Sequence, residues 1–375
     1  MRDSQCRDHS SLTGSHAGLG RVLDIHGDGR LRGEIHGESL REIIASTLER
    51  WRSGIAARHK VSPDVFVERF LNSTRFVETV TRETPDLRDE VEAIAAASNQ
   101  PAAEIWVLNL MDEEWRFGHS KGIGCSVLAG RLADPLGVVA IGQNMDLPSY
   151  MGGSQAVLRI AARDGEPAQI VMTAAGMVGL LGLNQLGLAC CVNTLKDLPS
   201  STDGLPVAFV LREILRRRNA KSALALLNTV DHASGQHYAI ADQDFILGAE
   251  CSASGCSAVE FSEQFAHTNH PLWTAPEVVA SVTEPTRTDT FTRLSALEAA
   301  LPYIRTQGDI ERTLSDGESG LCVRPTETAP TTTFCSVEFV LETPPAVRVA
   351  LGTPDKTEWE SIGWAGDVVT QYDPC

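Results

Sequence analysis

The chain has 375 residues, of which 42% are hydrophobic and 22% are charged, so it can bury a substantial core and is not a disordered chain. Its net charge of −17 is expected to repel nucleic acid and anionic lipid. The nine cysteines are odd in number, irregularly spaced and without a CxxC pair. The sequence therefore favours reduced thiols over a disulfide framework or a zinc ribbon.

The first 20 residues are polar and contain no apolar stretch of the signal-peptide kind. We expect residues 1–20 to form a mobile tail. No run in the sequence approaches the roughly 18 apolar residues that would cross a bilayer. These features predict a cytoplasmic protein with neither a membrane partner nor a nucleic-acid partner.

Up to about residue 120, apolar residues recur at helical spacing. This spacing predicts helices over 38–58 and 63–71. Pro85 opens a further helix, and Pro101 begins another that runs through Met111, because proline is favoured in the first helical turn. The first third of the chain is therefore expected to be helical.

After residue 120 the sequence changes to short apolar runs separated by glycine. The order of these segments predicts an α+β fold in which two sheets are layered with helices. We expect strands at 125–129, 138–143, 156–160, 169–174 and 188–192, helices at 206–217 and 222–230, strands at 238–241, 245–249 and 257–261, helices at 290–301 and 309–314, and strands at 331–341 and 346–351.

Cys125 follows Gly124 at the point where the two patterns meet, and it has two interpretations. A free cysteine at the start of an apolar strand is usually a small buried hydrophobe. Alternatively, cleavage of the Gly124–Cys125 bond would release Cys125 as an N-terminal nucleophile. Its own α-amine, with an ordinary pKa of roughly 7.7–8.0, would then serve as the base for its thiol.

Three motifs follow this pair in order. Residues 142–147 read Gly-Gln-Asn-Met-Asp-Leu, residues 182–188 read Gly-Leu-Asn-Gln-Leu-Gly-Leu, and residues 267–270 read His-Thr-Asn-His. Together with Gly124-Cys125, they resemble the acyl-coenzyme A:6-aminopenicillanic acid (isopenicillin N) acyltransferase family of N-terminal-nucleophile hydrolases. The resemblance extends from about residue 38 to residue 355.

This resemblance implies an αββα sandwich, with two layered antiparallel sheets flanked by helices, after a helical N-terminal segment. It also implies self-cleavage into chains 1–124 and 125–375. The helical part, 21–124, would remain associated with the second chain, 125–375, in one composite domain. The cleaved chains would then form an αβ heterodimer, open to further oligomerisation.

The resemblance assigns roles to three residues. Cys125 matches the nucleophile, Asp146 matches the acid that holds the new α-amine, and Asn269 matches the side-chain donor to the oxyanion. Taken alone, Asp146 also fits an Asx turn at a strand end, and Asn269 also fits a loop cap. The catalytic roles of Asp146 and Asn269 are therefore inferred from the motifs occurring together.

Substrate contacts are predicted for Asn144, Asn193 and Arg324. Asn193 stands where the family has an asparagine near the site, and Arg324 is a candidate for contact with a ligand carboxylate. The relatives that hydrolyse bile-salt and penicillin V amides carry an arginine three residues before the aspartate. This chain has Gln143 at that position, which argues against that branch.

The sequence therefore predicts an amidohydrolase that cleaves a small N-acylated amine through an acyl-thioester on Cys125. One alternative is an acyltransferase that passes the acyl group between coenzyme A or an amide and a small amine. A second is a non-catalytic binding protein with the same fold. No cofactor is predicted, and no metal, because the pair His267 and His270 lacks a third ligand at a fitting spacing.

Overall fold

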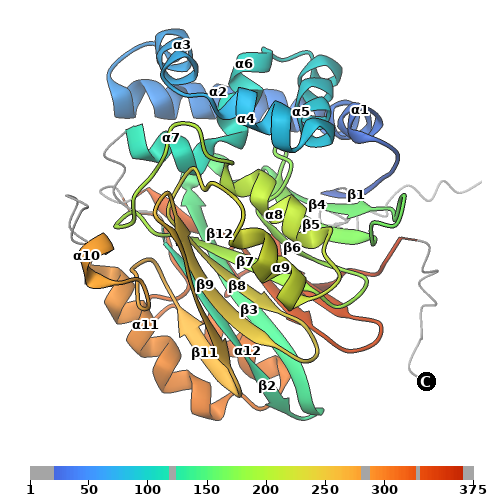
Figure 1. Ribbon diagram of the computed structural model, residues 1–375, viewed down its shortest axis with the longest axis vertical. Coiled ribbons are helices and arrows are strands. Elements are labelled where there is room, and N and C mark those ends of the chain that lie inside the picture. The colour runs from blue at the N-terminus through green and yellow to red at the C-terminus, as the bar shows by residue number, and fades with distance from the viewer. Residues whose placement is uncertain (1–20, 118–123, 280–287, 327–329, 366–375) are drawn as a thin grey trace, which may run out of the picture.

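The computed structural model describes residues 21–117, 124–279, 288–326 and 330–365. In Figure 1 the N-terminal helices lie at one end of the molecule, at the top of the view, and the strands extend away from them. The expected tail, residues 1–20, lies outside the described residues. No helix among the described residues is both long and apolar enough to span a bilayer.

The described segment before Cys125 begins with a short strand and continues as helices. The prediction of a helical first third is confirmed, with two differences. The helix expected over 38–58 begins later, at Arg41, and the strand β1 and the helices α1 and α4 were not predicted. The elements are β1 (Val22–Ile25), α1 (Gly29–Ser39), α2 (Arg41–His59), α3 (Pro63–Ser73), α4 (Phe76–Glu83), α5 (Pro85–Ser98), α6 (Ala102–Asn109) and α7 (Met111–Phe117).

The larger sheet has the strand order β1-β4-β5-β6-β7-β8-β9-β10. Its neighbouring strands are antiparallel except for β1, which runs parallel to β4 at the edge. Each predicted strand in this region is found within a few residues, and β6 was missed. The bounds are β4 (Gln155–Ile160), β5 (Gln169–Ala174), β6 (Leu181–Asn184), β7 (Ala189–Thr194), β8 (Gln236–Ala241), β9 (Ile246–Ser252) and β10 (Gly255–Phe261).

The second sheet has the order β11-β2-β3-β12-β13-β14 and is antiparallel throughout. At its centre, β2 pairs with β3 so that Cys125 lies opposite Met145. The strands β11 and β14 were not predicted. The bounds are β2 (Cys125–Ala133), β3 (Leu136–Pro148), β11 (Gln264–His267), β12 (Thr331–Val340), β13 (Ala346–Ala350) and β14 (Glu360–Ser361).

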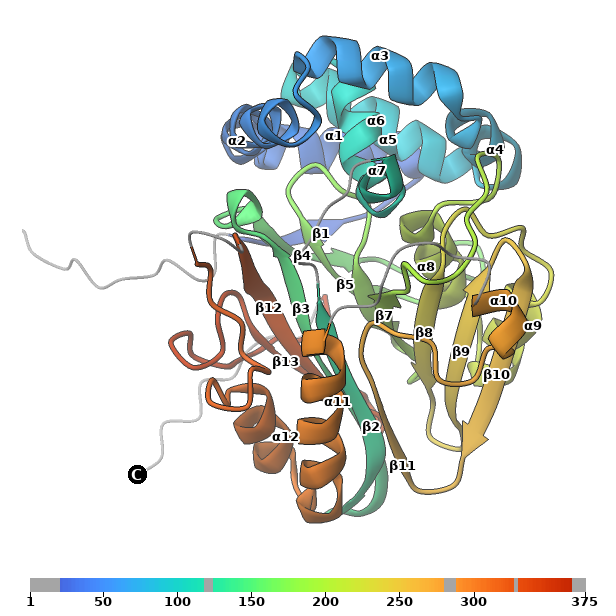
Figure 2. The same cartoon turned by 90° about the vertical axis from the view of Figure 1, so that its left-hand side faces the viewer.

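The two sheets face each other, and helices cover both outer faces (Figure 2). Helices α8 (Val207–Leu215) and α9 (Ala220–Leu227) pack on the larger sheet, and α11 (Thr288–Ala300) and α12 (Gln307–Leu314) pack on the smaller one. The shorter helical segments are α10 (Pro276–Val279), η2 (Ser149–Met151) and η3 (Leu301–Tyr303). The predicted sandwich of two layered sheets flanked by helices is confirmed, with one parallel strand pair as its exception.

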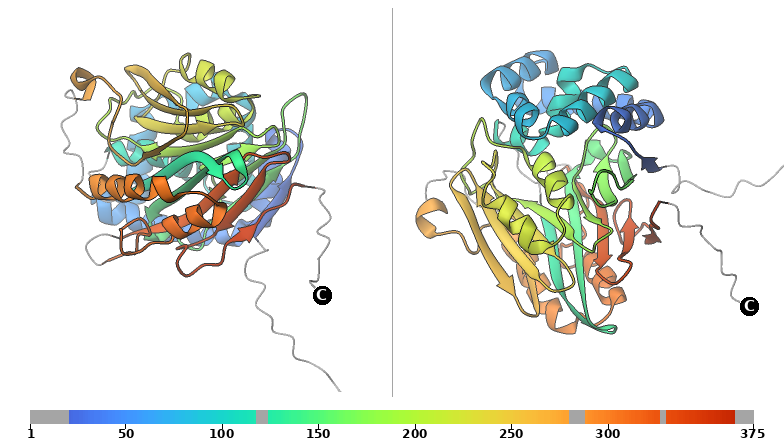
Figure 3. Two further views of the ribbon diagram at one scale, coloured as in Figure 1. Left: turned by 90° about the horizontal axis from the view of Figure 1, so that it is seen from below. Right: turned by 45° about the vertical axis from the view of Figure 1, so that its right-hand side comes forward.

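Two features bind the N-terminal helices together and to the sandwich, and Figure 3 shows this layer from two further sides. Helix α1 lies directly on α5 because its face carries glycines at every fourth position. A Cβ at Gly33 would lie 2.3 Å from the backbone oxygen of Glu90. The fully buried Glu90 also pairs with Arg212 of α8 at 2.9 Å and with Arg32 at 2.7 Å.

Candidate active site

Cys125 is the first residue of β2 and lies beside residues of α6 and α7, with which it lines a small cavity. Only 4% of its surface is exposed, because both sheets and α7 surround it. Burial, together with the negative charge of Asp146, raises the pKa of its thiol to about 12. The hydrogen bond from the backbone N–H of Asp146 opposes that rise. In the uncleaved chain the resting sulfur is therefore a neutral thiol.

The backbone of Cys125 is held from both sides. Its N–H donates to Oδ1 of Asn269 at 2.7 Å, and its carbonyl oxygen accepts from Nδ2 of Asn193 at 3.0 Å. The carbonyl oxygen of the preceding Gly124 accepts from the backbone N–H of Asp146 at 3.1 Å. Asn269 and Asp146 therefore hold the peptide bond that was predicted to break, and Asn193 holds the carbonyl of the peptide bond after it.

Arg293 is the site residue that the sequence analysis missed. Its Nη1 donates to the Cys125 carbonyl oxygen at 2.6 Å and to Oγ of Ser126 at 2.8 Å. Its Nη2 donates to Oδ1 of Asn269 at 2.9 Å. A Cβ at Gly124 would lie 2.6 Å from the same nitrogen, so the guanidinium lies where any other residue would place its side chain. A signal was present in α11, since Arg293 interrupts a stripe of buried apolar residues next to Leu294.

The side-chain amide of Asn269 has a defined orientation. Oδ1 of Asn269 faces a backbone N–H and a guanidinium, which only donate, and its Nδ2 donates to the Thr194 carbonyl oxygen at 3.0 Å. In the uncleaved chain Asn269 therefore presents its oxygen to the Cys125 backbone. One N–H of its amide is used by Thr194, which leaves the second as the donor that an oxyanion would need.

Asp146 is fully buried on β3, and its Oδ1 accepts from the hydroxyl of Thr333 at 2.7 Å. That hydroxyl in turn accepts from the backbone N–H of Val323 at 2.8 Å. The carboxylate is therefore fixed within electrostatic reach of the Cys125 sulfur. This position is compatible with the predicted contact to a new α-amine.

Two of the predicted substrate contacts lie elsewhere. Asn144 donates to the carbonyl oxygens of Leu314 and Leu321 at 2.7 and 2.8 Å and accepts from Ser336, so its amide ties β3 to the loop after α12. Arg324 is half exposed and pairs with Asp355. It lines an open pocket of about 530 Å³, and Arg293 lines the same pocket. The structure thus brings Asn193, but not Asn144, against Cys125.

A small apolar cavity touches Cys125 from the side of the helices. Its volume is about 20 Å³, which is room for a single water molecule. Met111 and Trp115 of α7 line one wall, and Met145 and Met177 line the other. A substrate acyl group would need this space to widen.

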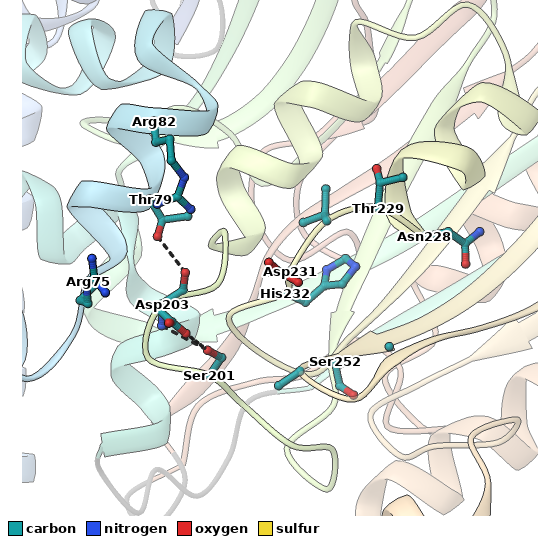
Figure 4. Close-up of a pocket in the computed structure, with 13 residues that line it drawn as sticks. Arg75, Thr79, Arg82, Ser201, Asp203, Asn228, Thr229, Asp231, His232 and Ser252 are labelled. Atoms are coloured by element: carbon teal, nitrogen blue, oxygen red, sulfur yellow. Dashed lines mark hydrogen bonds between the residues drawn. The ribbon is translucent and has the colours of Figure 1, made fainter.

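A second polar pocket lies between α4 and the loops around residues 201 and 230, and its volume is about 420 Å³ (Figure 4). Arg75 and Arg82 line it, but each forms a surface ion pair, with Glu78 and Glu83 respectively. Cys125 and its partners are not among the residues that line it. The chemistry described above therefore belongs to the Cys125 region.

Solved structures resemble parts of this fold. A mutant of the conjugated bile acid hydrolase from Clostridium perfringens has a TM-score of 0.44 and 12% identity, over 64% of this chain and 97% of that one. The Caenorhabditis elegans orthologue of N-acylethanolamine-hydrolyzing acid amidase has a TM-score of 0.41 and 14% identity, over 58% and 93%. Penicillin V acylase from Agrobacterium tumefaciens has a TM-score of 0.41 and 14% identity, over 60% and 83%.

No curated protein sequence gives a significant match. The family model of acyl-coenzyme A:6-aminopenicillanic acid acyl-transferase matches residues 137–355. Asp146, Asn193, Asn269 and Arg293 lie within that range, and Cys125 precedes it. Because the match covers more than half of the 375 residues, the chain belongs to the acyl-coenzyme A:6-aminopenicillanic acid acyl-transferase family.

Proposed function

We propose that this protein is a self-cleaving cysteine amidohydrolase that acts on a small N-acylated amine. The observation that carries the proposal is the set of contacts around the Gly124–Cys125 peptide bond. Asn269 holds the Cys125 N–H and the backbone N–H of Asp146 holds the oxygen of Gly124, while Arg293 and Asn193 hold the carbonyl oxygen of the next peptide bond. Side chains supply three of these four contacts, where an ordinary strand residue would have its backbone paired with a neighbouring strand.

In the first turnover, the Cys125 sulfur attacks the Gly124 carbonyl carbon. The backbone N–H of Asp146 stabilises the negative charge that develops on the Gly124 oxygen, because it already donates a hydrogen bond to that oxygen. The thiol proton passes to the departing nitrogen, the C–N bond breaks, and the peptide becomes a thioester. Water then hydrolyses the thioester, which yields the Gly124 carboxylate, the free thiol and the new α-amine.

Later turnovers repeat this step on an external amide. The new α-amine, with an ordinary pKa of roughly 7.7–8.0, takes the thiol proton and returns it to the leaving amine. The Asp146 carboxylate orients that amine. The second N–H of the Asn269 amide is the side-chain donor to the oxyanion. Removing one such donor typically costs about 10²–10³ in turnover.

The substrate proposal follows from the two spaces beside the site. The cavity at Cys125 has methionine and tryptophan walls, which suit an apolar acyl group. The open pocket lined by Arg293 and Arg324 suits the more polar part of a substrate. Because the cavity is nearly closed to water, transfer of the acyl group to a second amine is the competing outcome.

Intact-mass analysis of freshly synthesised protein tests the proposal. Wild-type protein should convert into two chains, 1–124 and 125–375, and Cys125→Ala should remain a single chain. Arg293→Lys should convert on the order of 10² times more slowly, because an ammonium cannot reproduce the forked contacts of the guanidinium. The exposed Arg312, which pairs with Asp309, provides the matched control Arg312→Lys.

The processed protein should then release acid from short N-acyl amines, with added amines as competing acceptors. More acyl-amine product than acid would identify a transferase. A wild-type chain that stays intact after folding would refute self-cleavage. A cut at any bond other than Gly124–Cys125 would refute the assignment of Cys125 as the N-terminal nucleophile.

A further inference from the structure

A pair of buried histidines lies behind Asn193 and is not used by the mechanism above. His237 of β8 and His267 of β11 are both fully buried, and their rings stack with centroids 3.7 Å apart. Nδ1 of His237 lies 3.3 Å from Oδ1 of Asn193. The other end of the Asn193 amide donates to the Cys125 carbonyl oxygen. One polar path therefore connects the stacked rings to the backbone of the nucleophile.

The hydrogens along this path follow from donor and acceptor chemistry. The Cys125 carbonyl accepts only, so Asn193 must present Nδ2 to it and Oδ1 to His237. An amide oxygen also accepts only, so Nδ1 of His237 must carry the hydrogen. Burial, reinforced by His267, places the pKa of His237 well below its ordinary value. The ring is therefore neutral, with its hydrogen on Nδ1.

His267 faces acceptors on both sides. Nδ1 lies 2.8 Å from the Thr268 carbonyl oxygen, and Nε2 lies 2.9 Å from Oε1 of Glu250. Glu250 also accepts from the backbone N–H groups of residues 272–274 and from the Thr274 hydroxyl. Burial alone would raise the pKa of Glu250, but these hydrogen bonds hold it below its ordinary value. Glu250 and the Thr268 carbonyl therefore hold the His267 ring by both of its nitrogens.

Trp273 packs against both histidine rings. Its ring centroid lies 5.4 Å from that of His237 and 5.1 Å from that of His267. The tryptophan ring occupies the space that a Cβ at residue 248 would need, at 2.4 Å, and Gly248 leaves that space open. With His267 on one face and Trp273 against its edge, the His237 ring has no room to turn.

We propose that His237 is a positioning residue for the nucleophile. Its Nδ1–H fixes the amide of Asn193, which fixes the carbonyl of Cys125, and the pair formed by Glu250 and His267 fixes His237. The inference rests on the proposed function for its effect on rate. Without the Nδ1–H, the Asn193 amide is free to flip and to turn its oxygen toward the Cys125 carbonyl, which misplaces the reacting residue.

Substitutions at His237 separate positioning from packing. An asparagine places its side-chain nitrogen close to the position of Nδ1, whereas a glutamine places its nitrogen close to Nε2. His237→Asn should therefore retain most self-cleavage. His237→Gln and His237→Phe should slow it about 10- to 100-fold, the usual effect of losing an outer partner of a functional ligand. Equal rates in the Asn and Phe variants would overturn the proposal.

A matched control is His232, which is also buried and contacts the Leu227 carbonyl oxygen at 3.0 Å through Nε2. His232→Phe should lower the melting temperature and leave the rate of self-cleavage unchanged. If it slows cleavage as strongly as His237→Phe, the effect is general destabilisation and the positioning role is refuted.

A second measurement does not depend on cleavage. Nitrogen-15 chemical shifts of the uncleaved Cys125→Ala chain should show the hydrogen of His237 on Nδ1. A hydrogen on Nε2 of His237 would overturn the proposal. Wild-type protein that never cleaves would refute the proposed function, and the chemical shifts would still test the hydrogen-bonded path.

Discussion

At the scale of single residues, the buried thiol of Cys125 makes self-cleavage sensitive to pH. Burial and the charge of Asp146 raise its pKa to about 12, so only about one thiol in 10⁵ is ionised at pH 7. If that thiolate is the attacking species, cleavage should accelerate about tenfold for each unit between pH 6 and pH 9. Intact-mass time courses of cell-free protein moved into buffers of different pH measure this slope.

A rate that does not change with pH would contradict this prediction. It would mean that a fixed base removes the thiol proton during attack. The carboxylate of Asp146 is the candidate for that base, because its charge acts on the Cys125 thiol. Cys125→Ser is the internal comparison, because a hydroxyl ionises far less readily than a thiol. Its cleavage should be slower at every pH in the series.

The motifs predicted much of the site at this scale, because each stood beside a strand. Cys125 and Asp146 lie on the paired strands β2 and β3, so their proximity depends on register alone, whereas Asn193 reaches Cys125 from β7 of the facing sheet. Arg293 comes from a helix more than 160 residues away along the chain, and only packing brings it to Gly124. Arg324 pairs with Asp355 and lines the same pocket as Arg293, and its contact with a ligand carboxylate stays a prediction.

At the scale of elements, the contact between α1 and α5 depends on a stripe of glycines. Gly33→Ala should destabilise the protein by about 1–3 kcal/mol, the usual cost of overpacking. An alanine would add up to about 1 kcal/mol of helix propensity, but its Cβ would lie 2.3 Å from a backbone oxygen, which cannot rotate away. Thermal unfolding of the variant measures which effect is larger.

The control is Glu34→Ala on the exposed face of the same helix, where the side chain forms a surface ion pair with Arg30. It should change stability by no more than about 0.5 kcal/mol. A Gly33→Ala variant as stable as the wild type would show that α1 and α5 can separate without loss.

The elements that sequence patterns missed have weak local signals in the sequence. The helix α1 carries three glycines on its buried face, so it lacks the apolar stripe by which helices are recognised. The strands β1 and β11 have four residues each and acquire their identity from neighbours in the sheets. Cys190 and Cys191 are consecutive on β7 and therefore point to opposite faces of the strand. Both are fully buried, because β7 is covered on both sides.

At the scale of the whole molecule, the helical segment should remain bound after cleavage. Although burial opposes it, the charges of Arg212 and Arg32 hold the pKa of Glu90 below its ordinary value, so the carboxylate stays ionised in neutral buffer. Glu90→Gln would leave the buried guanidinium of Arg212 without its counter-charge, while Arg32 would keep Asp86, at a cost of about 3–5 kcal/mol. The cleaved variant should therefore separate at lower urea concentrations than the wild type in size-exclusion chromatography.

The matched control is Glu83→Gln on α4, where the carboxylate is exposed and forms a surface ion pair with Arg82. Its chains should separate at the wild-type urea concentration. If Glu90→Gln behaves in the same way, the association depends on apolar contacts and not on the buried ion pair.

The parallel pairing of β1 with β4 has a practical consequence for making the active form directly. A recombinant chain that starts at Cys125 would already possess the N-terminal thiol, but it would lack residues 22–25. The outer edge of β4 would then present unpaired backbone N–H and C=O groups, and such edges recruit strands from other molecules. The 1–124 segment thus covers a sheet edge. We expect the two segments to resist aggregation when they are produced together.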